Sequence, residues 1–228
     1  MRVILLAAGV GSRLKPLTNK IPKCLAPIKG IPLLRIWLER LIKANLGPFL
    51  INTHHLADQV ESFIKDSPYC NQVKLVNEPT LRGTAATLIS NLDFCDNKDI
   101  MLIHADNYCL ADLISFQEAH NHRPHECLMT MMTFRTTNPS LCGIVEVDDK
   151  NVVTGFYEKV TKPPGNLANG AVYILSADLL RIISKDLSYA KDFSTEILCH
   201  FVGRIYSYET TKLFLDIGTP EAYKKANM

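Results

Sequence analysis

The feature of this sequence that most constrains its fold is the alternation of short apolar runs with amphipathic stretches through its first half. Short apolar runs are typical of strands buried on both faces, and the amphipathic stretches are typical of the helices that cover them. The expected strands are Arg2–Ala8, Phe49–Thr53, Val73–Asn77 and Ile100–Ala105, and the expected helices are Leu33–Ala44, Leu56–Lys65, Thr84–Asn91 and Ala111–His120. This βαβα order predicts a mostly parallel sheet wrapped by helices.

The pattern changes after Pro124, where strands become more frequent than helices. The expected strands are Leu128–Arg135, Gly143–Val147, Val152–Tyr157, Ala171–Leu175, Arg204–Tyr208 and Lys212–Leu215, with helices at Ala177–Ser184, Ser194–Val202 and from Pro220. No repeat or linker divides the chain. We therefore expect one domain, residues 1–228, of the α/β class: a Rossmann-like three-layer α/β/α sandwich with a mixed, mostly parallel central sheet.

Composition excludes several classes of protein. Charged residues make up 21% and apolar residues 47% of the 228 residues, which is typical of a folded core rather than a disordered chain. A net charge of +2 gives no indication of nucleic-acid binding, and no apolar run is long enough to span a membrane. The seven cysteines are an odd number without a CxxC pair, so we expect a reduced, cytoplasmic protein. An assembly of identical subunits is left open.

A glycine-containing loop follows the first expected strand, with Gly9 and Gly11 and then Arg13. Such a loop lets backbone N–H groups approach phosphate oxygens. It is not the dinucleotide-binding fingerprint, because Leu14 stands where the third glycine is needed, and it lacks the Gly-Lys-Ser/Thr ending of a P-loop. Seven Lys or Arg residues and no Asp or Glu precede Glu39. This segment is therefore either an anion-binding segment or a solvated basic face.

The longer pattern around this loop resembles a known family. The residues are Gly9-x-Gly11-x-Arg13-Leu14-x-Pro16-Leu17-Thr18, followed by Pro22-Lys23 and Pro27-Ile28. They are similar to the signature of the sugar-1-phosphate nucleotidyltransferases, above all those that transfer a guanylyl group to mannose or heptose 1-phosphate. The resemblance implies a reaction of a nucleoside triphosphate with a sugar 1-phosphate that releases pyrophosphate.

The resemblance also implies roles for residues along the whole chain. It implies nucleotide contacts from Leu6, Ala8, Gly9, Gly11, Ser12, Arg13, Glu78, Gly83 and Thr84, and sugar-phosphate contacts from Gly143, Glu158, Lys159 and Asn169. Arg13, Lys23 and Asp106 are the implied catalytic residues, and Asp106 with Asp216 are the implied ligands of Mg²⁺. The nucleotide-binding half is expected at about residues 1–122 and the sugar-phosphate-binding half at about 123–228.

Such a reaction requires few kinds of chemistry from the protein. A sugar 1-phosphate is already an anion, so its oxygen can attack the α-phosphorus without a strong base. The remaining task is to align two anions and neutralise their charge with Mg²⁺, Arg and Lys. GTP is the expected triphosphate, because a Glu78 carboxylate can accept from the two adjacent donors of guanine.

Other interpretations stay open. The enzyme alternatives are a uridylyl- or thymidylyltransferase acting on another sugar 1-phosphate, and a cytidylyltransferase for a phosphocholine-like substrate. The non-enzyme alternative is an inactive subunit that binds a nucleotide sugar. Single residues have structural alternatives as well: Asp106 as a helix cap and Glu78 as a solvent-facing residue before a turn. We interpret the cluster of His120, His122 and His125 as a solvated loop rather than a metal site, because it lacks Cys or carboxylate partners at metal spacing.

Overall fold

The computed structural model describes all 228 residues, which form two compact units. The first unit contains residues 1–81, 103–110 and 213–228. The second unit contains residues 82–102 and 111–212. The chain therefore leaves the first unit and returns to it twice, so the units do not coincide with two successive halves of the sequence.

The first unit is built on a parallel sheet. Its strands lie in the order β6-β1-β4-β5, where β1 is Arg2–Leu6, β4 is Phe49–Thr53, β5 is Val73–Asn77 and β6 is Ile100–His104, whose last two residues belong to this unit. Parallel pairing sets Leu6 beside Asn52, and Thr53 beside Asn77. The carboxyl ends of the strands therefore share one edge of the sheet, which is where ligands bind in open α/β sheets.

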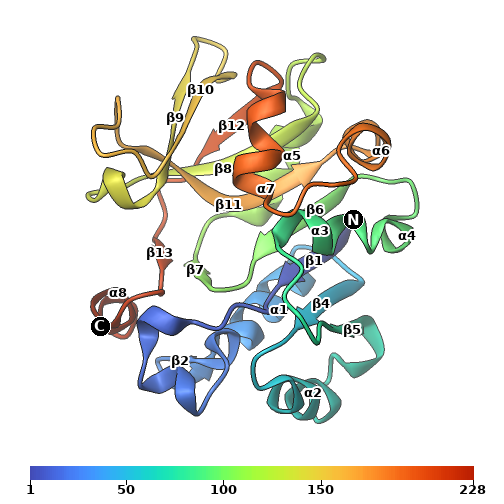
Figure 1. Ribbon diagram of the computed structural model, residues 1–228, viewed down its shortest axis with the longest axis vertical. Helices are drawn as coiled ribbons and strands as arrows, with labels where there is room; N and C mark the ends of the chain where they lie inside the picture. Colours follow the sequence, from blue (N-terminus) through green and yellow to red (C-terminus); the bar gives the residue numbers. More distant parts are fainter. The chain divides into compact units, whose positions relative to one another are not determined.

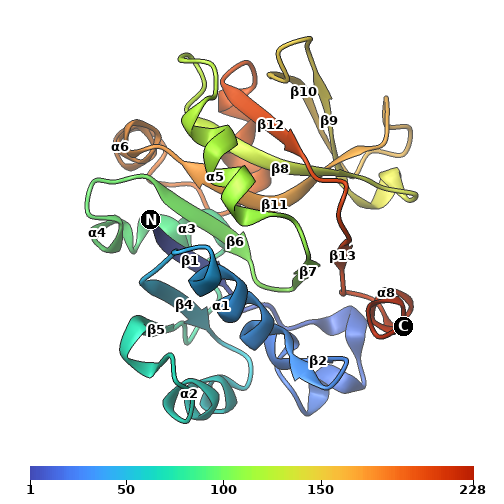
Figure 2. The same cartoon turned by 180° about the vertical axis from the view of Figure 1, so that it is seen from behind.

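Two longer helices accompany these strands, α1 (Leu33–Lys43) and α2 (Ala57–Lys65). In Figure 2, α1 lies on the near side of β1 and β4. Its apolar face is fully buried, with Trp37 and Leu41 at 0–1% exposure. The Trp37 indole N–H donates to the backbone oxygen of Asn107 at 2.8 Å, which attaches α1 to the segment that follows β6.

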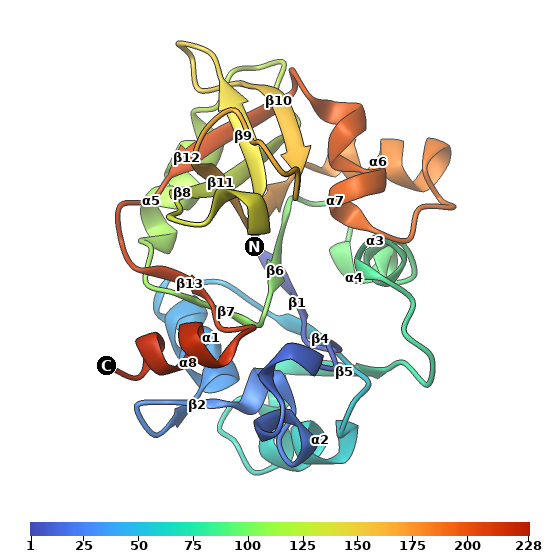
Figure 3. The same cartoon turned by 60° about the vertical axis from the view of Figure 1, so that its left-hand side comes forward.

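Short elements fill the rest of the first unit. They are the 3₁₀ turns η1 (Ser12–Leu14), η2 (Leu17–Asn19), η3 (Lys23–Leu25) and η4 (Cys70–Gln72), the strands β2 (Pro27–Ile28), β3 (Ile31–Pro32), β7 (Asn107–Cys109) and β13 (Phe214–Asp216), and the helix α8 (Pro220–Ala226). Figure 3 shows β13 alongside β7, with α8 close to β2. The Tyr223 hydroxyl donates to the Pro27 oxygen at 2.7 Å, so the end of the chain is attached to the N-terminal segment.

The second unit has a mixed sheet. Its strands are β8 (Met129–Arg135), β9 (Gly143–Val147), β10 (Val153–Glu158), β11 (Leu167–Leu175) and β12 (Ile205–Glu209). The order is β10-β9-β11-β8-β12, with antiparallel pairs except for the parallel pair of β8 with β12. The helices are α3 (Thr84–Ile89), α4 (Leu92–Cys95), α5 (Leu113–Asn121), α6 (Ala177–Asp186) and α7 (Phe193–Glu196), and the 3₁₀ turns are η5 (Pro139–Leu141) and η6 (Leu198–Phe201).

Helices cover both faces of the strands of this unit. Helix α5 lies in front of β8 and β12 in Figure 2, and α7 lies in front of β8 and β11 in Figure 1. The Phe116 ring of α5 meets the Tyr208 ring of β12 at a centroid distance of 5.4 Å. On the other face, Phe193 of α7 meets Tyr173 of β11 at 4.9 Å. The expected α/β, three-layer class with a mixed, mostly parallel sheet is confirmed.

The largest difference from the sequence prediction lies at residues 194–202, where we expected one helix. The helix α7 ends at Glu196, and η6 begins after Ile197. The Glu196 carboxylate folds back to accept from the backbone N–H groups of Lys191 and Asp192 at 2.7 Å each. The last residue of α7 thus caps the N–H groups that precede its first residue, and the helix is a single turn. Strand β11 is longer than expected and begins at Leu167, and β1 ends at Leu6, two residues early.

Candidate active site

The centre of the candidate site in the first unit is a buried lysine held between two aspartates. The Lys23 Nζ donates to Asp106 Oδ2 at 2.7 Å and to Asp216 Oδ1 at 3.1 Å. The lysine side chain is only 6% exposed, whereas the two aspartate side chains are 37% and 52% exposed. We call Lys23, Asp106 and Asp216 the aspartate–lysine cluster. The prediction placed these three residues in one site, and the structure brings them together.

Strand pairing explains why these distant residues meet. Asp106 lies directly before β7, and Asp216 is the last residue of β13. The antiparallel pairing of these two strands sets Asp216 opposite Asn107, one residue from Asp106. Because a strand follows Asp106, the alternative that it caps a helix is wrong. The Asp216 carboxylate is also fixed by the Gly218 N–H, which donates to Oδ1 at 2.8 Å.

Lys23 and Asp106 stabilise each other's charged form. Burial alone would lower the pKa of Lys23, but the attraction of Asp106 and Asp216 outweighs it and raises this pKa. Burial would likewise raise the pKa of Asp106, yet the attraction of Lys23 and His104 holds it below the ordinary value. Both groups therefore carry their charges near neutral pH.

The glycine loop lies beside this cluster. Gly11 has a φ of +65°, and a Cβ there would come within 2.8 Å of Thr18 Cγ2 and 3.2 Å of Lys23 Cβ. The fold thus requires glycine at position 11. Gly9 is different, because a Cβ there would meet nothing within 4 Å and its φ lies outside the left-handed range. Nothing in the fold demands Gly9, so its small size leaves room for a ligand to approach the backbone.

The other predicted residues of the N-terminal loop have mixed exposure. Ser12 and Arg13 are exposed, and the Arg13 Nη2 lies 3.6 Å from Asp216 Oδ2. Leu6 and Ala8 are buried at 8% and 6% exposure, so only their backbone atoms could contact a nucleotide. The Leu6 oxygen already accepts from the Ala105 N–H at 3.0 Å.

Glu78 is buried, at 1% exposure, so the alternative that it faces solvent is wrong. Its backbone N–H donates to the Thr53 oxygen at 2.8 Å, and its backbone oxygen lies 2.7 Å from His54 Nδ1. Its Oε1 accepts from the Asn52 Nδ2 at 3.1 Å. A nucleobase can reach this carboxylate only after the side chain rotates or the atoms above it move.

Asn52 is a site residue that the sequence analysis missed. Its Oδ1 accepts from the Ala7 N–H at 2.8 Å, while its Nδ2 donates to Glu78. The Ala7 N–H therefore fixes which end of the amide faces Glu78. A polar residue in the otherwise apolar strand Phe49–Thr53 was the available signal, because a buried polar group usually has a specific partner.

Gly83 and Thr84, predicted nucleotide ligands, lie in the second unit against residues 191–193. Gly83 has a φ of +99°, and a Cβ there would come within 2.4 Å of the Lys191 oxygen. The Phe193 N–H donates to Thr84 Oγ1 at 2.7 Å. Both residues therefore have a structural reason for their identity, and their nucleotide contacts remain a prediction.

The predicted sugar-phosphate residues lie on strands of the second unit. Glu158 ends β10, and its Oε1 lies 2.9 Å from the Lys159 Nζ. A Cβ on Gly143 would come within 2.5 Å of Glu158 Oε2, so the glycine allows the carboxylate to lie against β9. Lys159 is 65% exposed.

Asn169, the remaining sugar-phosphate candidate, braces an irregular part of β11. Its Nδ2 donates to the Tyr173 hydroxyl at 2.7 Å, and its Oδ1 accepts from the Ala171 N–H at 2.9 Å. The pairing of β11 with β8 shifts register between Asn169 and Tyr173. The amide therefore stabilises a bulge, and any sugar contact has to use its remaining lone pair or proton.

Within the cluster of His120, His122 and His125, the last two are exposed as expected, but His120 is not. His120 is 0% exposed, with Nε2 3.2 Å from Asp99 Oδ2 and Nδ1 2.8 Å from Thr130 Oγ1. Burial lowers the pKa of His120, and the hydrogen bond from His120 lowers the pKa of Asp99. The buried imidazole and its half-exposed carboxylate partner join α5 to β8 and to the residue before β6.

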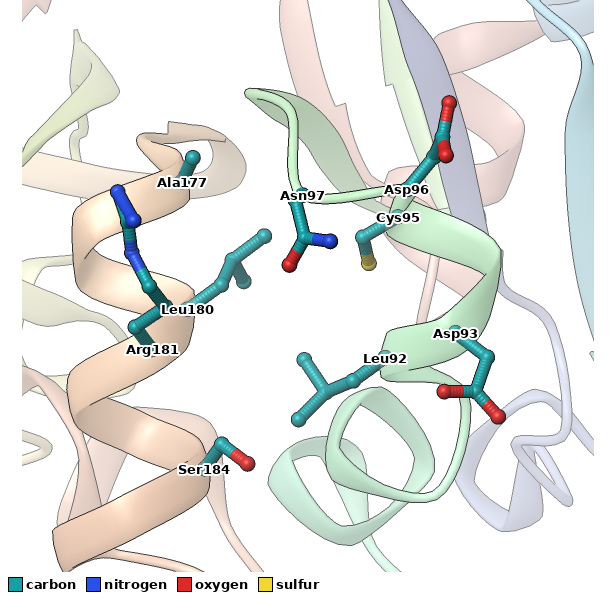
Figure 4. Close-up of a pocket in the computed structure, with 9 residues that line it drawn as sticks. All are labelled: Leu92, Asp93, Cys95, Asp96, Asn97, Ala177, Leu180, Arg181 and Ser184. Atoms are coloured by element: carbon teal, nitrogen blue, oxygen red, sulfur yellow. The ribbon is translucent and has the colours of Figure 1, made fainter.

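A pocket of ≈ 340 Å³ lies between α4 and α6 of the second unit (Figure 4). Leu92, Asn97 and Leu180 extend toward this space, whereas Asp93 and Asp96 point away from it. None of the predicted site residues lines the pocket. Its two acidic lining residues, Asp93 and Asp96, turn away from the space, so the pocket has no counterpart of the aspartate–lysine cluster.

A family model and the similar proteins of known name all point to one family. A family model described as nucleotidyl transferase matches residues 2–228. Mannose-1-phosphate guanylyltransferase of Mycobacterium tuberculosis is 26% identical over 98% of this chain and 63% of its own length. D-glycero-alpha-D-manno-heptose 1-phosphate guanylyltransferase of Campylobacter jejuni subsp. jejuni is 28% identical over 98% of this chain and 97% of its own length. The chain thus spans less than two thirds of the first relative and nearly all of the second.

A solved structure is similar along the whole chain. The crystal structure of HddC from Yersinia pseudotuberculosis complexed with GMP-PN is 26% identical, with a TM-score of 0.81 over 99% of this chain and 97% of that one.

Proposed function

Because the chain belongs to the nucleotidyl transferase family, we propose that it transfers the nucleotidyl group of a nucleoside triphosphate to a sugar 1-phosphate and releases pyrophosphate. The oxygen of the sugar phosphate attacks the α-phosphorus, and the bond from the α-phosphorus to the bridging oxygen of the pyrophosphate breaks. The protein aligns the two substrates and stabilises the charge that crowds around the α-phosphorus.

The aspartate–lysine cluster is the observation that carries this proposal. Lys23 supplies a cation beside the glycine loop, and Arg13 lies at the exposed side of Asp216. The planar Arg13 guanidinium suits two phosphate oxygens, whereas the Lys23 ammonium acts as a point charge. Gly9, which the fold does not require, leaves the backbone accessible where a phosphate would lie.

We propose Mg²⁺ as the cofactor, held by Asp106 and Asp216. The fit is good because oxygens of both carboxylates lie within 3.1 Å of the same Lys23 nitrogen, so one cation can contact both. No group of three or more His, Cys, Asp or Glu residues forms a complete metal site. Two carboxylates without further protein ligands suit Mg²⁺, which keeps waters and phosphate oxygens in its shell. A bound Mg²⁺ would supply charge neutralisation at the phosphates.

GTP is the proposed donor, and guanylyl the transferred group. Two relatives carry guanylyltransferase names, and the similar crystal structure is complexed with GMP-PN. The geometry adds physical support. The fixed Asn52 amide donates to one oxygen of Glu78, and a carboxylate can only accept, so it presents an acceptor to a base once the side chain rotates or the atoms above it move. Guanine offers donors on its Watson–Crick edge, and uracil and thymine offer a single donor between two acceptors.

Glu78→Gln tests the base. A glutamine would direct its amide oxygen to Asn52, so the other end of its amide, the NH₂ group, would be a donor toward the base, which favours uracil or thymine over guanine. We expect the ratio of kcat/KM for GTP to that for UTP to fall about tenfold, within the range of one bidentate pair. The matched control is Glu61→Gln, an exposed residue of α2. A wild type that prefers UTP or dTTP, or an unchanged ratio in Glu78→Gln, contradicts the base assignment.

A manno-configured hexose or heptose 1-phosphate is the proposed acceptor, with Gly143, Glu158, Lys159 and Asn169 as its ligands. The relatives named for mannose and heptose 1-phosphate support this choice. Lys159 can pair with the phosphate and Glu158 with sugar hydroxyls, because one is a cation and the other an acceptor.

The reducing interior of a cell is the proposed setting. All seven cysteines are free; Cys24, Cys95, Cys109 and Cys127 are buried, and Cys70 and Cys199 are exposed. Burial raises the pKa of the Cys24 thiol to about 12, so it stays protonated and unreactive. No helix is both long enough and apolar enough to cross a bilayer.

The test of the whole proposal is a matrix of substrates. Each common nucleoside triphosphate is combined with each of a panel of sugar 1-phosphates and with phosphocholine, and pyrophosphate release is measured with and without Mg²⁺. We expect release with GTP and a manno-configured sugar phosphate, and none in excess chelator. Release with CTP and phosphocholine, or no release from any pair, contradicts the proposal.

A further inference from the structure

Lys23 occupies a place that a cation shared by Asp106 and Asp216 would occupy. Its ammonium lies 2.7 Å from one carboxylate and 3.1 Å from the other, and its side chain is almost completely buried. The stem of the side chain is held as well, because Lys23 begins η3 and its Cβ lies against the glycine loop at Gly11. The ammonium is therefore an internal cation and not a mobile surface charge.

The charges of the free site balance without a metal. Two carboxylates face Lys23, and Arg13 lies 3.6 Å from the outer oxygen of Asp216. A divalent ion that entered this arrangement would compete with Lys23 for the same two oxygens and would be repelled by both cations. The repulsion and the competition that oppose metal binding disappear once phosphate oxygens give Lys23 and Arg13 other partners.

We infer that Lys23 blocks the metal site of the free protein and yields the two aspartates to the metal only when a triphosphate draws its ammonium away. This inference depends on the proposed role of Asp106 and Asp216 as metal ligands. It assigns Lys23 a second task besides phosphate binding: it couples metal binding to nucleotide binding. Metal and triphosphate then bind with positive coupling, because each relieves the charge that opposes the other.

The consequence is that removing Lys23 strengthens metal binding in the absence of nucleotide. Mn²⁺ serves as a probe that electron paramagnetic resonance counts directly as free ion. We expect Lys23→Met, which replaces the charged side chain with an unbranched neutral one that is one atom shorter, to bind one Mn²⁺ at least about tenfold more tightly than wild type, within the usual range of coupling between sites. The control Lys20→Met removes an exposed lysine from the same basic segment and leaves the Mn²⁺ affinity unchanged.

A double variant, Lys23→Met with Asp106→Asn, locates the effect. We expect it to lose the tightened site. Tightening that persists in the double variant, or a Mn²⁺ affinity in Lys23→Met equal to or weaker than that of wild type, overturns the inference. Circular dichroism checks that each variant is folded, and Lys23→Gln replaces Lys23→Met if the latter is not.

A measurement on the unaltered protein makes the inference independent of any variant. Crystals of the wild type grown without nucleotide are soaked in Mn²⁺, and anomalous scattering is used to locate the ion. We expect no peak between Asp106 and Asp216 while the Lys23 ammonium contacts both. A peak there with Lys23 in place overturns the inference.

The proposed function fails in a different way. It fails if pyrophosphate release from every substrate pair is absent or indifferent to Mg²⁺, whereas the Mn²⁺ titration of the free protein involves no substrate and no turnover.

Discussion

The two units each contain a lysine beside carboxylates, but the two lysines differ in nearly every physical respect. Lys23 is 6% exposed, and its ammonium is shared by two aspartates from distant parts of the chain. Lys159 is 65% exposed, and its partner is the preceding residue Glu158. Packing and strand pairing fix Lys23 between its two aspartates, whereas the Lys159 ammonium can replace its contact with Glu158 by contacts with water. A cation that is held in place suits a reacting phosphate. An exposed, mobile cation suits a substrate that has to bind and dissociate.

The largest expected effect comes from the first unit. Asp106→Asn keeps the shape of the side chain and removes one of the two carboxylates that can hold a metal. We expect kcat to fall about 10²–10³-fold, as for the loss of one electrostatic group at a reacting centre. The unfolding free energy should change by about 1 kcal/mol or less, because Asp216 still pairs with Lys23. Steady-state pyrophosphate release and urea unfolding measure the two quantities.

Asp58→Asn, an exposed substitution in α2, is the control for this change and should leave both quantities unaltered. Full turnover of Asp106→Asn would mean that the cluster is structural, and the contrast between the two lysines would lose its functional meaning.

A direct comparison of the two lysines should give the next largest effects. Lys23→Ala removes the only buried cation between two carboxylates, so we expect a loss of turnover of about two orders of magnitude. We also expect the unfolding free energy to fall by about 1–3 kcal/mol, less than for a fully buried pair because the aspartates are partly exposed.

Lys159→Ala should leave the unfolding free energy within about 1 kcal/mol of wild type, as is usual for an exposed pair. It should raise KM for the sugar 1-phosphate about tenfold, the value of one charge-assisted hydrogen bond. If Lys159→Ala destabilises the fold as much as Lys23→Ala does, the two lysines do not differ in their structural role, and the contrast between them is wrong.

Two glycines of the first unit have different expected roles: Gly11 allows a backbone conformation, and Gly9 allows a ligand to approach. Gly11→Ala should lower the unfolding free energy by about 1–3 kcal/mol, because φ is +65° and the new Cβ meets Thr18. Gly9→Ala should leave thermal stability unchanged and raise KM for the triphosphate, because its Cβ would meet no protein atom. Differential scanning fluorimetry and steady-state kinetics test both. An unchanged KM in Gly9→Ala would show that no phosphate approaches there.

The smallest expected effect concerns pH and the second unit. His120 and Asp99 both have pKa values in the folded protein below those of the unfolded chain, so the unfolded chain takes up protons first. The stability that each contributes is present at high pH and is lost as pH falls. Loss should begin near the ordinary histidine pKa of 6.5 and continue below the ordinary aspartate pKa of 3.8.

Urea unfolding from pH 8 to pH 5 should therefore show a decline of at most about 1.4 kcal/mol per pH unit from His120. His120→Asn should remove most of this slope, whereas His122→Asn, an exposed neighbour, should retain it. An equal slope in both variants would mean that His120 is not the group that takes up the proton.

The elements that could be predicted from sequence are those whose apolar pattern decides their structure locally. The strands Phe49–Thr53, Val73–Asn77 and Gly143–Val147 have the predicted bounds because burial and turn residues delimit them. The turns η1, η2 and η3 were not predicted, since they depend on prolines and on contacts such as the Thr18 hydroxyl donating to the Gly11 oxygen at 2.8 Å.

The site was less accessible to sequence reasoning than the fold. Lys23 lies 83 residues from Asp106 and 193 from Asp216, so no local spacing relates them. Only the resemblance to a family placed them together. Glu78 shows the opposite case, because its position in the motif gave no sign that Asn52 and the strand ends would bury it. Burial is a property of the assembled sheet, and a motif does not contain it.

The distribution of the free thiols makes the molecule suitable for site-directed labelling. Cys70 is exposed in the first unit and Cys199 is exposed in the second, while Cys24, Cys95, Cys109 and Cys127 are buried. With the partly exposed Cys142 replaced by serine, nitroxide labels attach at one position in each unit. Dipolar coupling between the labels then measures the separation of the units and how far a triphosphate or a sugar phosphate changes it. The sequence thus already supplies one attachment point in each unit for this distance measurement.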